Sequence, residues 1–191
     1  DGDPLGALGD LGWYCVRASL WAADWALPAS VAAHPGWVRT SEGVPIANVG
    51  ATLVFGQGAN GRSVTATVRA SFASSLTQSL HILGEKGSLA LDDFVVPRSE
   101  HRAAIVHECR AGLGADHVDV VSRRETHVVE SPANQETLLW ERVAAEVAAA
   151  GRGEGDAELR ARWVEQADKT QRVLFAIMES AADGGAQVPV R

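Results

Sequence analysis

Cysteine and long hydrophobic runs are scarce in this sequence. Cys15 and Cys109 are the only cysteines among 191 residues, and they form neither a CxxC pair nor a disulfide framework. We therefore expect two reduced, buried thiols in a cytoplasmic protein. No apolar run reaches the roughly 18–20 residues of a membrane span, and the first residues do not resemble a signal peptide. We accordingly expect no membrane partner.

Basic residues are also in deficit, since 17 Lys and Arg face 24 Asp and Glu, for a formal net charge of −7. Such a charge argues against a nucleic-acid partner. The length and the 46% hydrophobic content are typical of one soluble globular domain with a sizeable core. The chain begins with Asp1 and its sole methionine is Met178, so we expect a piece of a longer protein.

Three familiar catalytic or nucleotide-binding patterns are missing. The hexamer at residues 56–61 fits GxGxxG, but a dinucleotide site needs a helix next, and the sequence that follows alternates as a strand. Asn60-Gly61 instead predicts a hairpin turn. Residues 84–88 lack the order of a phosphate-binding P-loop, and no GxSxG nucleophile elbow is present.

The six histidines form no HExxH motif and no Cys/His cluster, so we predict no metal site. His117 and Asp119 would share one strand face, where a solvated surface is the simpler interpretation. His81 lies on a strand predicted to be central, where a hydrogen-bonded core histidine is the alternative to a binding role.

After a first helical stretch at residues 5–25, strand patterns follow and helical patterns close the chain. One or two strands, interrupted at His34-Pro35-Gly36, are predicted at residues 30–40. Further strand segments occur at residues 47–55, 63–73, 77–83, 88–91, 101–109, 117–122 and 125–130. Helical segments follow at residues 135–149 and 156–182, and an edge strand is predicted at 187–190. The predicted packed face of the first segment consists of Leu138, Leu139, Val143 and Val147, and that of the second of Val164, Ala167, Gln171, Leu174 and Met178. Strands in hairpin succession followed by helices predict an α+β fold, with a mostly antiparallel open sheet and helices packed on one face.

The most informative stretch is residues 5–25, LGALGDLGWYCVRASLWAADW. On a helix at about 100° per residue, it gathers an acid, a phenol, a guanidinium and two indoles on one face. That face consists of Asp10, Trp13, Tyr14, Arg17, Trp21 and Asp24. Gly12 costs a helix roughly 1 kcal/mol relative to alanine, which indicates a close approach to the backbone. A half-buried helix that merely turns these groups to solvent is the alternative.

The segment GALGDLGWYC resembles the G-A-L-x-D-x-G-x-Y/H signature that opens the second domain of the Gfo/Idh/MocA oxidoreductases, which include dihydrodiol and xylose dehydrogenases. GEKGSLALDDF is similar to the family's turn and strand G-x-x-G-x-L-x-L-x-D-F, and DKTQRVLFAIMESA to its last helix. The nearest likeness is to the plant and bacterial branch with GWYC after the aspartate. The resemblance implies that residues 1–191 are a C-terminal substrate-binding and oligomerisation domain without its nucleotide-binding domain.

The resemblance also implies residue roles. Tyr14 is expected to relay a proton, with Asp10 supporting it, because oxidation of an alcohol requires a group that takes the hydroxyl proton. A phenol, with a pKa of about 10, does so poorly unless nearby positive charge lowers that pKa. In the family this charge comes from a lysine of the nucleotide domain and from the oxidised nicotinamide. We also expect three substrate contacts. Arg17 and Trp13 lie on the helical face, and His81 lies on the sheet that forms the floor of the substrate cleft in the family.

The implied reaction is reversible NAD- or NADP-dependent oxidation of a secondary alcohol in a sugar, polyol or trans-dihydrodiol. Alone, the chain is expected to be inactive. A non-catalytic sensing or assembly domain from the same family is the alternative. Small, uncharged residues on the second face of strands 47–55 and 63–73 predict a homo-oligomer formed through the outer sheet face, and a sheet face open to water is the competing account.

Overall fold

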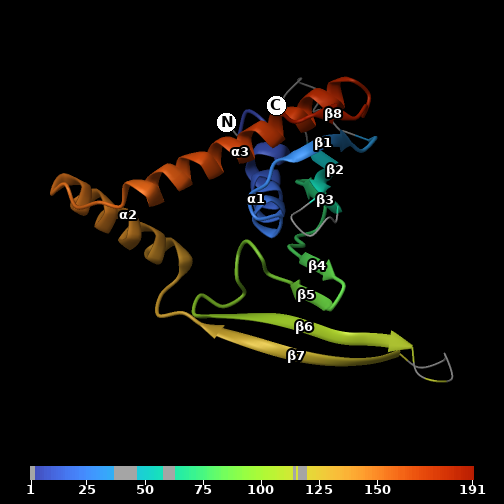
Figure 1. Ribbon diagram of the computed structural model, residues 1–191, viewed down its shortest axis with the longest axis horizontal. Helices are drawn as coiled ribbons and strands as arrows, with labels where there is room; N and C mark the ends of the chain where they lie inside the picture. Colours follow the sequence, from blue (N-terminus) through green and yellow to red (C-terminus); the bar gives the residue numbers. More distant parts are fainter. Residues whose placement is uncertain (1–2, 37–46, 58–62, 114, 116–119) are drawn as a thin grey trace. The chain divides into compact units, whose positions relative to one another are not determined.

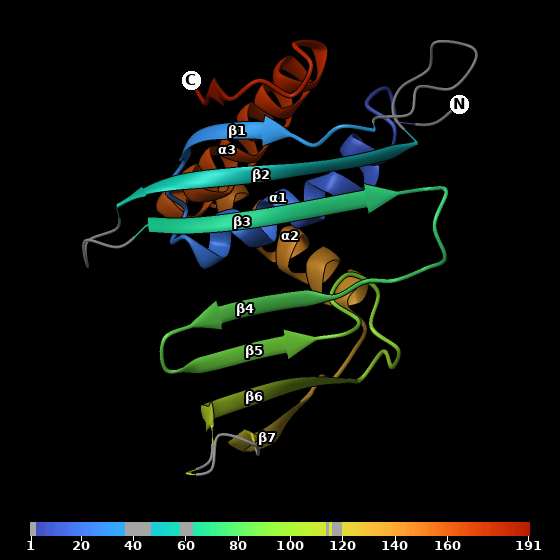
Figure 2. The same cartoon turned by 90° about the vertical axis from the view of Figure 1, so that its right-hand side faces the viewer.

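The computed structural model describes residues 3–36, 47–57, 63–113, 115 and 120–191. They form two compact units, one of Asp1–Ser74 with Ala157–Arg191 and one of Ser75–Asp156 (Figures 1 and 2). The predicted α+β class with antiparallel sheets is confirmed. The described strands form two four-stranded sheets, however, rather than one open sheet. Residues 72–79 form no continuous strand, and the hairpins before and after this segment pair separately.

The sheet of the first unit has the order β3-β2-β1-β8. Its strands are β1 (Pro28–Ala33), β2 (Asn48–Gln57), β3 (Ser63–Ser71) and β8 (Val188–Pro189), and every pairing is antiparallel. The predicted hairpin of β2 and β3 is confirmed by this pairing, although its turn at residues 58–62 lies outside the described part. Because β3 directly follows the glycine-rich segment, no helix begins there. The predicted edge strand near the end of the chain is also confirmed.

Two helices, α1 (Trp13–Ala22) and α3 (Ala157–Ala182), cover one face of this sheet and lie behind it in Figure 2. The strand alternation explains the packing, since Ala51 pairs with Val68, and Leu53 with Val31. These side chains point to the same face and are buried against the helices. The fully or nearly fully buried core contains Leu8, Val16, Leu20, Val31, Val49, Ala51, Leu53, Phe55, Val173, Leu174 and Ile177.

The first helix ends earlier than the sequence predicts. After Ala22 the chain leaves the helix, and Asp24 and Trp25 have φ of 53° and 59°. The Trp25 amide donates to the Leu20 carbonyl at 2.7 Å and the Asp24 amide to Trp21 at 3.1 Å, the two bonds of a Schellman motif. Glycine usually occupies the left-handed position of this motif. Because Asp24 takes that position here, the sequence did not indicate where the helix ends.

The last helix packs on the core through its predicted face, but only over its second half. Its buried residues are Thr170, Val173, Leu174, Ala176, Ile177 and Ser180. Of the residues expected to pack, Leu174 is fully buried, Ala167, Gln171 and Met178 are half-buried, and Val164 is 71% exposed. The first turns of α3 extend past the sheet, and packing begins only from about residue 170. Position along the helix, not apolar character alone, therefore decides burial here.

Ser180 links α3 to the sheet and to the final turn. Its fully buried hydroxyl accepts from the Ala33 amide at 2.8 Å and donates to the Ala186 carbonyl at 2.6 Å. We expect Ser180→Ala to lower the free energy of unfolding by about 1–3 kcal/mol, because two buried backbone groups lose their partner. Ser19→Ala is the control, since Ser19 bonds only to Cys15 in its own helix and should cost less than about 0.5 kcal/mol. Urea unfolding measures both, and equal losses would contradict the linking role.

The second unit contains the sheet β4-β5-β6-β7, again antiparallel throughout. Its strands are β4 (Leu80–Gly84), β5 (Gly87–Leu91), β6 (Arg102–Leu113) and β7 (Val120–Glu130). The two short strands predicted at residues 117–122 and 125–130 are thus a single strand from Val120. The predicted pair of His117 and Asp119 lies outside the described residues.

One helix, α2 (Gln135–Gly151), follows β7, and it begins where the sequence predicts. The Asn134 side chain accepts from the Thr137 amide at 2.8 Å and so caps the helix. The residues predicted to form a packed face of α2 are not buried: Leu138, Leu139, Val143 and Val147. None of the described helices combines the length and the apolar character needed to cross a bilayer.

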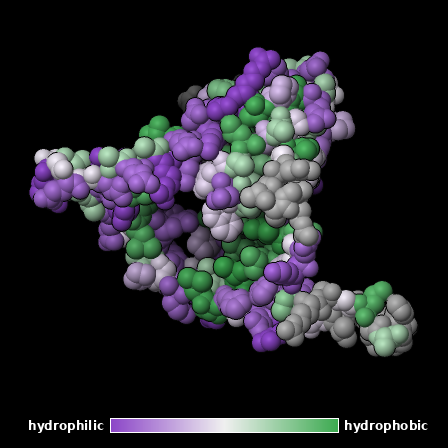
Figure 3. Space-filling model, in the orientation of Figure 1, coloured by the Kyte–Doolittle hydropathy of each residue, from purple (hydrophilic) through white to green (hydrophobic). Residues whose placement is uncertain are grey.

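No described residue of this second unit is buried. Apolar side chains are instead exposed along its strands and helix, among them Leu83, Leu89, Val96, Val129 and Trp140. Figure 3 shows hydrophobic atoms at the surface where Figure 1 places β4 and β5. The first unit is therefore the part of the described chain with its own apolar core.

Candidate functional site

The segment that precedes α1 is a turn of π-helix, η1 (Leu8–Gly12). Such wide turns recur at functional sites in proteins. The Asp3 carboxylate accepts from the Leu5 amide at 2.7 Å and lies directly over Gly9, where a Cβ would come within 1.9 Å of its oxygen. At Gly12 a Cβ would lie 3.0 Å from the Leu8 side chain. The predicted close approach to the backbone is thus made from within the chain, most tightly at Gly9.

Asp10 and Tyr14 lie one turn apart at the junction of η1 and α1, and both side chains are exposed to solvent. Tyr14 is 44% exposed, which is high for a phenol in an apolar-rich helix. The opposite side of this helix carries Val16 and Leu20, which are fully buried. The helix therefore turns its carboxylate and its phenol away from the core, where a small molecule can reach them.

Arg17 is held by contacts within the protein. Its Nη2 donates to Gln166 Oε1 on α3 at 3.1 Å, and its guanidinium carbon lies 5.2 Å from the ring centroid of Trp25. Partial burial lowers the pKa of Arg17 from its ordinary value. The side chain thus joins α1 to α3 on the same helix face as Tyr14. Neither contact was predicted, because Gln166 is 149 positions from Arg17 and Trp25 follows the unpredicted end of α1.

Lys169 of α3 holds the chain just after the end of α1. Its Nζ donates to the Trp25 carbonyl at 2.9 Å and lies 2.7 Å from Glu165 Oε1. The hydrogen bond and positive charge of Lys169 hold the pKa of Glu165 below its ordinary value. Together with Gln166, this lysine makes α3 the support on which the α1 face is positioned.

The remaining predicted residues differ in their surroundings. Trp13 is half-buried and packs against the core. His81 is exposed on β4, which lies at one edge of the second unit's sheet, so the predicted central strand and the alternative of a core histidine are both wrong. Tyr14, Asp10, Arg17 and Trp13 share the first unit, whereas His81 belongs to the second.

The two cysteines are free, as expected, but half-buried rather than fully buried. The Cys15 thiol lies 3.7 Å from the Arg69 carbonyl, and burial raises the pKa of this thiol from its ordinary value. A raised thiol pKa disfavours the thiolate and hence nucleophilic chemistry. Cys15 is therefore a packing residue on the side of α1 that contacts β3.

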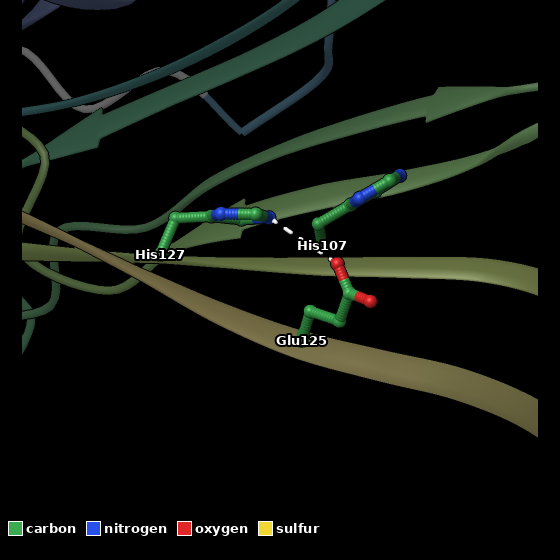
Figure 4. Close-up of side chains that lie close together, drawn as sticks. All are labelled: His107, Glu125 and His127. Carbon is green, nitrogen blue, oxygen red and sulfur yellow. Dashed lines mark ion pairs between the residues drawn. The ribbon is translucent and has the colours of Figure 1, made fainter.

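A cluster that the sequence reasoning missed lies in the second unit, where His107, Glu125 and His127 come together on β6 and β7 (Figure 4). The three residues are separated by up to 20 positions, so no local motif marks them. The signal that could have found them is the pairing of two alternating strands, which places His107 opposite Glu125.

No family model matches the sequence. Among solved structures, the fold is similar to a single-residue variant of KijD10, a 3-ketoreductase from Actinomadura kijaniata in complex with TDP-benzene and NADP, at 19% identity and a TM-score of 0.62, over 92% of this chain and 47% of that chain. The open conformation of KijD10 gives 20% identity and a TM-score of 0.59, over 91% and 46%. A candidate oxidoreductase from Bacteroides fragilis gives 14% and 0.55, over 98% and 52%.

The chain thus spans about half the length of these solved structures. At these identities the similarity establishes the fold, which is that of the C-terminal domain of oxidoreductases. The strand that follows the glycine-rich segment, together with the antiparallel sheets, agrees with this result, since no Rossmann unit occurs among the residues that the structure describes.

Proposed function

We propose that this chain is the substrate-binding domain of an NAD- or NADP-dependent Gfo/Idh/MocA-type oxidoreductase that acts on the CH–OH group of a sugar, polyol or dihydrodiol. The observation that carries the proposal is the exposed pair of Asp10 and Tyr14 on a helix supported by α3, in a fold shared with a ketoreductase. Tyr14 is also the only tyrosine of the chain, so it is the only phenol available as a proton relay.

A nicotinamide site does not fit the residues described here. The one GxGxxG segment connects two antiparallel strands, so no helix N-terminus follows it to receive a pyrophosphate. The proposal therefore assigns NAD or NADP to a separate nucleotide-binding domain, and it assigns only substrate and proton handling to this chain. We also propose that the protein acts in the cytoplasm, in keeping with its free cysteines.

In this proposal the Tyr14 hydroxyl exchanges a proton with the oxygen of the reacting carbon. Asp10, one turn earlier, accepts hydrogen bonds from substrate hydroxyls or from a lysine of the nucleotide-binding domain. Arg17, which Gln166 and Trp25 hold in place, is a further proposed substrate contact. Trp13 is a further proposed substrate contact in the first unit, and the role of His81 in the second unit stays a prediction from the family resemblance.

The test is an activity screen of the protein completed by a nucleotide-binding domain. Sugars, polyols and trans-dihydrodiols are offered with NAD and NADP, and the nicotinamide absorbance is followed. Turnover of at least one class supports the proposal. Absence of turnover, together with tight binding of a sugar by the 191-residue chain, would favour a non-catalytic sensing domain from the same family.

The outer face of the first unit's sheet is the proposed surface for self-association. Thr52 faces Thr67 there, and Val54 faces Thr65, so small uncharged residues occupy the centre of β2 and β3. His34 adds a 2.8 Å hydrogen bond from its Nε2 to the Thr52 hydroxyl. A flat face with few charges suits contact with a second copy better than a solvent surface does.

We expect light scattering at micromolar concentration to give the mass of a dimer or larger oligomer. Thr67→Glu adds a charge to the exposed centre of this face and should shift the mass towards the monomer. Thr77→Glu, a change at an exposed position outside β2 and β3, is the control and should leave the mass unchanged. A monomer in all three proteins would mean that the face is open to water.

A further inference from the structure

The register of β6 and β7 places three ligand-type side chains on one face of the second unit's sheet. His107 pairs directly with Glu125, and Ile105 pairs with His127. Residues opposite each other in an antiparallel pair point to the same face, as do residues two apart on one strand. His107, Glu125 and His127 therefore converge, and Figure 4 shows both rings and the carboxylate gathered over the strand pair.

We propose that His107, Glu125 and His127 form a binding site for a divalent transition-metal ion of the zinc class. One ligand atom from each residue lies within 4.8 Å of the other two. Around a tetrahedral zinc ion with bonds of about 2.0–2.1 Å, ligand atoms are about 3.3 Å apart. The three ligand atoms thus need to approach one another by up to about 1.5 Å. Rotations about the side-chain bonds supply this movement while the strands stay in place.

The donor set decides the class of ion. Two imidazole nitrogens and one carboxylate oxygen suit zinc and neighbouring transition metals, whereas calcium and magnesium select oxygen ligands. Three protein ligands leave a fourth position for water. His107 and Glu125 are half-buried and His127 is exposed, so the site is reachable from solution while two of its ligands are held by their surroundings.

Glu125 is already oriented for this role. Its Oε1 lies 2.5 Å from Arg123 Nη2, and its Oε2 lies 3.8 Å from His127 Nε2. Arg123 thereby fixes one oxygen and leaves the other directed at the histidines, as outer groups commonly do for metal ligands. The arginine charge opposes a cation, but its side chain is mostly exposed and its field is screened by water.

A bound ion would join two long strands in a unit that has no buried apolar residue among those described. Since an ion that binds only the folded state stabilises it, the site would act as a clamp on the β6–β7 pair. This effect provides a readout that is independent of any catalytic activity.

The test titrates zinc chloride into the untagged, chelator-treated 191-residue chain by calorimetry. We expect one zinc per chain for the wild type. His107→Gln and His127→Gln should each weaken binding by more than about tenfold, because each removes a ligand. His101→Ala is the matched control, since His101 is exposed directly before β6 and only its backbone carbonyl is used, by Ser131. This variant should bind as the wild type does.

Amide hydrogen exchange gives the second measurement. Zinc should slow exchange in β6 and β7 of the wild type and of His101→Ala, and leave it unchanged in the glutamine variants. Circular dichroism of the metal-free variants verifies that they are folded. If the wild type takes up no zinc, or if the glutamine variants bind it as tightly as the wild type, the cluster is only an ion pair between Glu125 and His127 and the proposal fails.

Discussion

Replacing Tyr14 by phenylalanine is expected to lower the turnover number of the completed oxidoreductase by about 10²- to 10⁴-fold, the usual contribution of general acid–base catalysis. The substitution removes only the hydroxyl and keeps the ring, so the packing of the helix on the core should be preserved. Tyr14 is the only phenol in the chain and is 44% exposed, so no other tyrosine can substitute for it. Steady-state kinetics with a substrate from the activity screen measure the effect.

The matched control is Trp21→Phe, a change at another exposed aromatic residue on the same helix. It should leave turnover within about threefold, since no proton-exchanging group is lost. In the Tyr14→Phe enzyme the affinity for the cofactor should hardly change. A plot of the turnover number against pH should lose the rise or fall that titration of Tyr14 produces in the wild type. Turnover within threefold of the wild type would make Tyr14 a packing residue and would favour the non-catalytic alternative.

Leu174→Ala is expected to lower the free energy of unfolding of the first unit by about 2–5 kcal/mol. Leu174 is fully buried in the middle of α3, in the cluster that also contains Leu53 and Leu20. Truncation removes transfer free energy and leaves a cavity that fixed helices cannot fill. Since domains are typically stable by only about 5–15 kcal/mol, this is a large share of the total.

Phe175→Ala is the control for this prediction. Its ring, at the next position of the same helix, is 56% exposed, so removing more atoms there should cost less than about 1 kcal/mol. Because β1 and β2 belong to the first of the two compact units, amide hydrogen exchange in these strands under increasing urea reports on the first unit. Similar losses for both variants would show that α3 does not pack through Leu174.

Local signals in the sequence predicted local structure well. The alternation of β2 and β3, with Asn60-Gly61 between them, predicted an antiparallel hairpin, and the apolar periodicity from residue 135 predicted the start of α2. These features depend on neighbours in the chain, for which periodicity is direct physical evidence.

Features that depend on distant partners were not predictable in the same way. The division into two sheets depends on which hairpins pair, and His81 was placed on a central strand although β4 is an edge. The anchoring of Arg17 by Gln166 joins positions 149 residues apart. Helix α1 ends at a left-handed aspartate, Asp24, instead of the usual glycine, so the sequence did not predict where this helix ends.

The first unit is assembled from both ends of the described chain, and this arrangement sets the order of events during synthesis. Strands β1 and β2 leave the ribosome early, but Leu174 and Ile177 complete their core only after the whole second unit has been made. At about 5–20 residues per second, the delay is on the order of ten seconds. During that interval Leu53 and Phe55 have no helix α3 to cover them, so the nascent chain presents an apolar strand to chaperones while the later hairpins are still being translated.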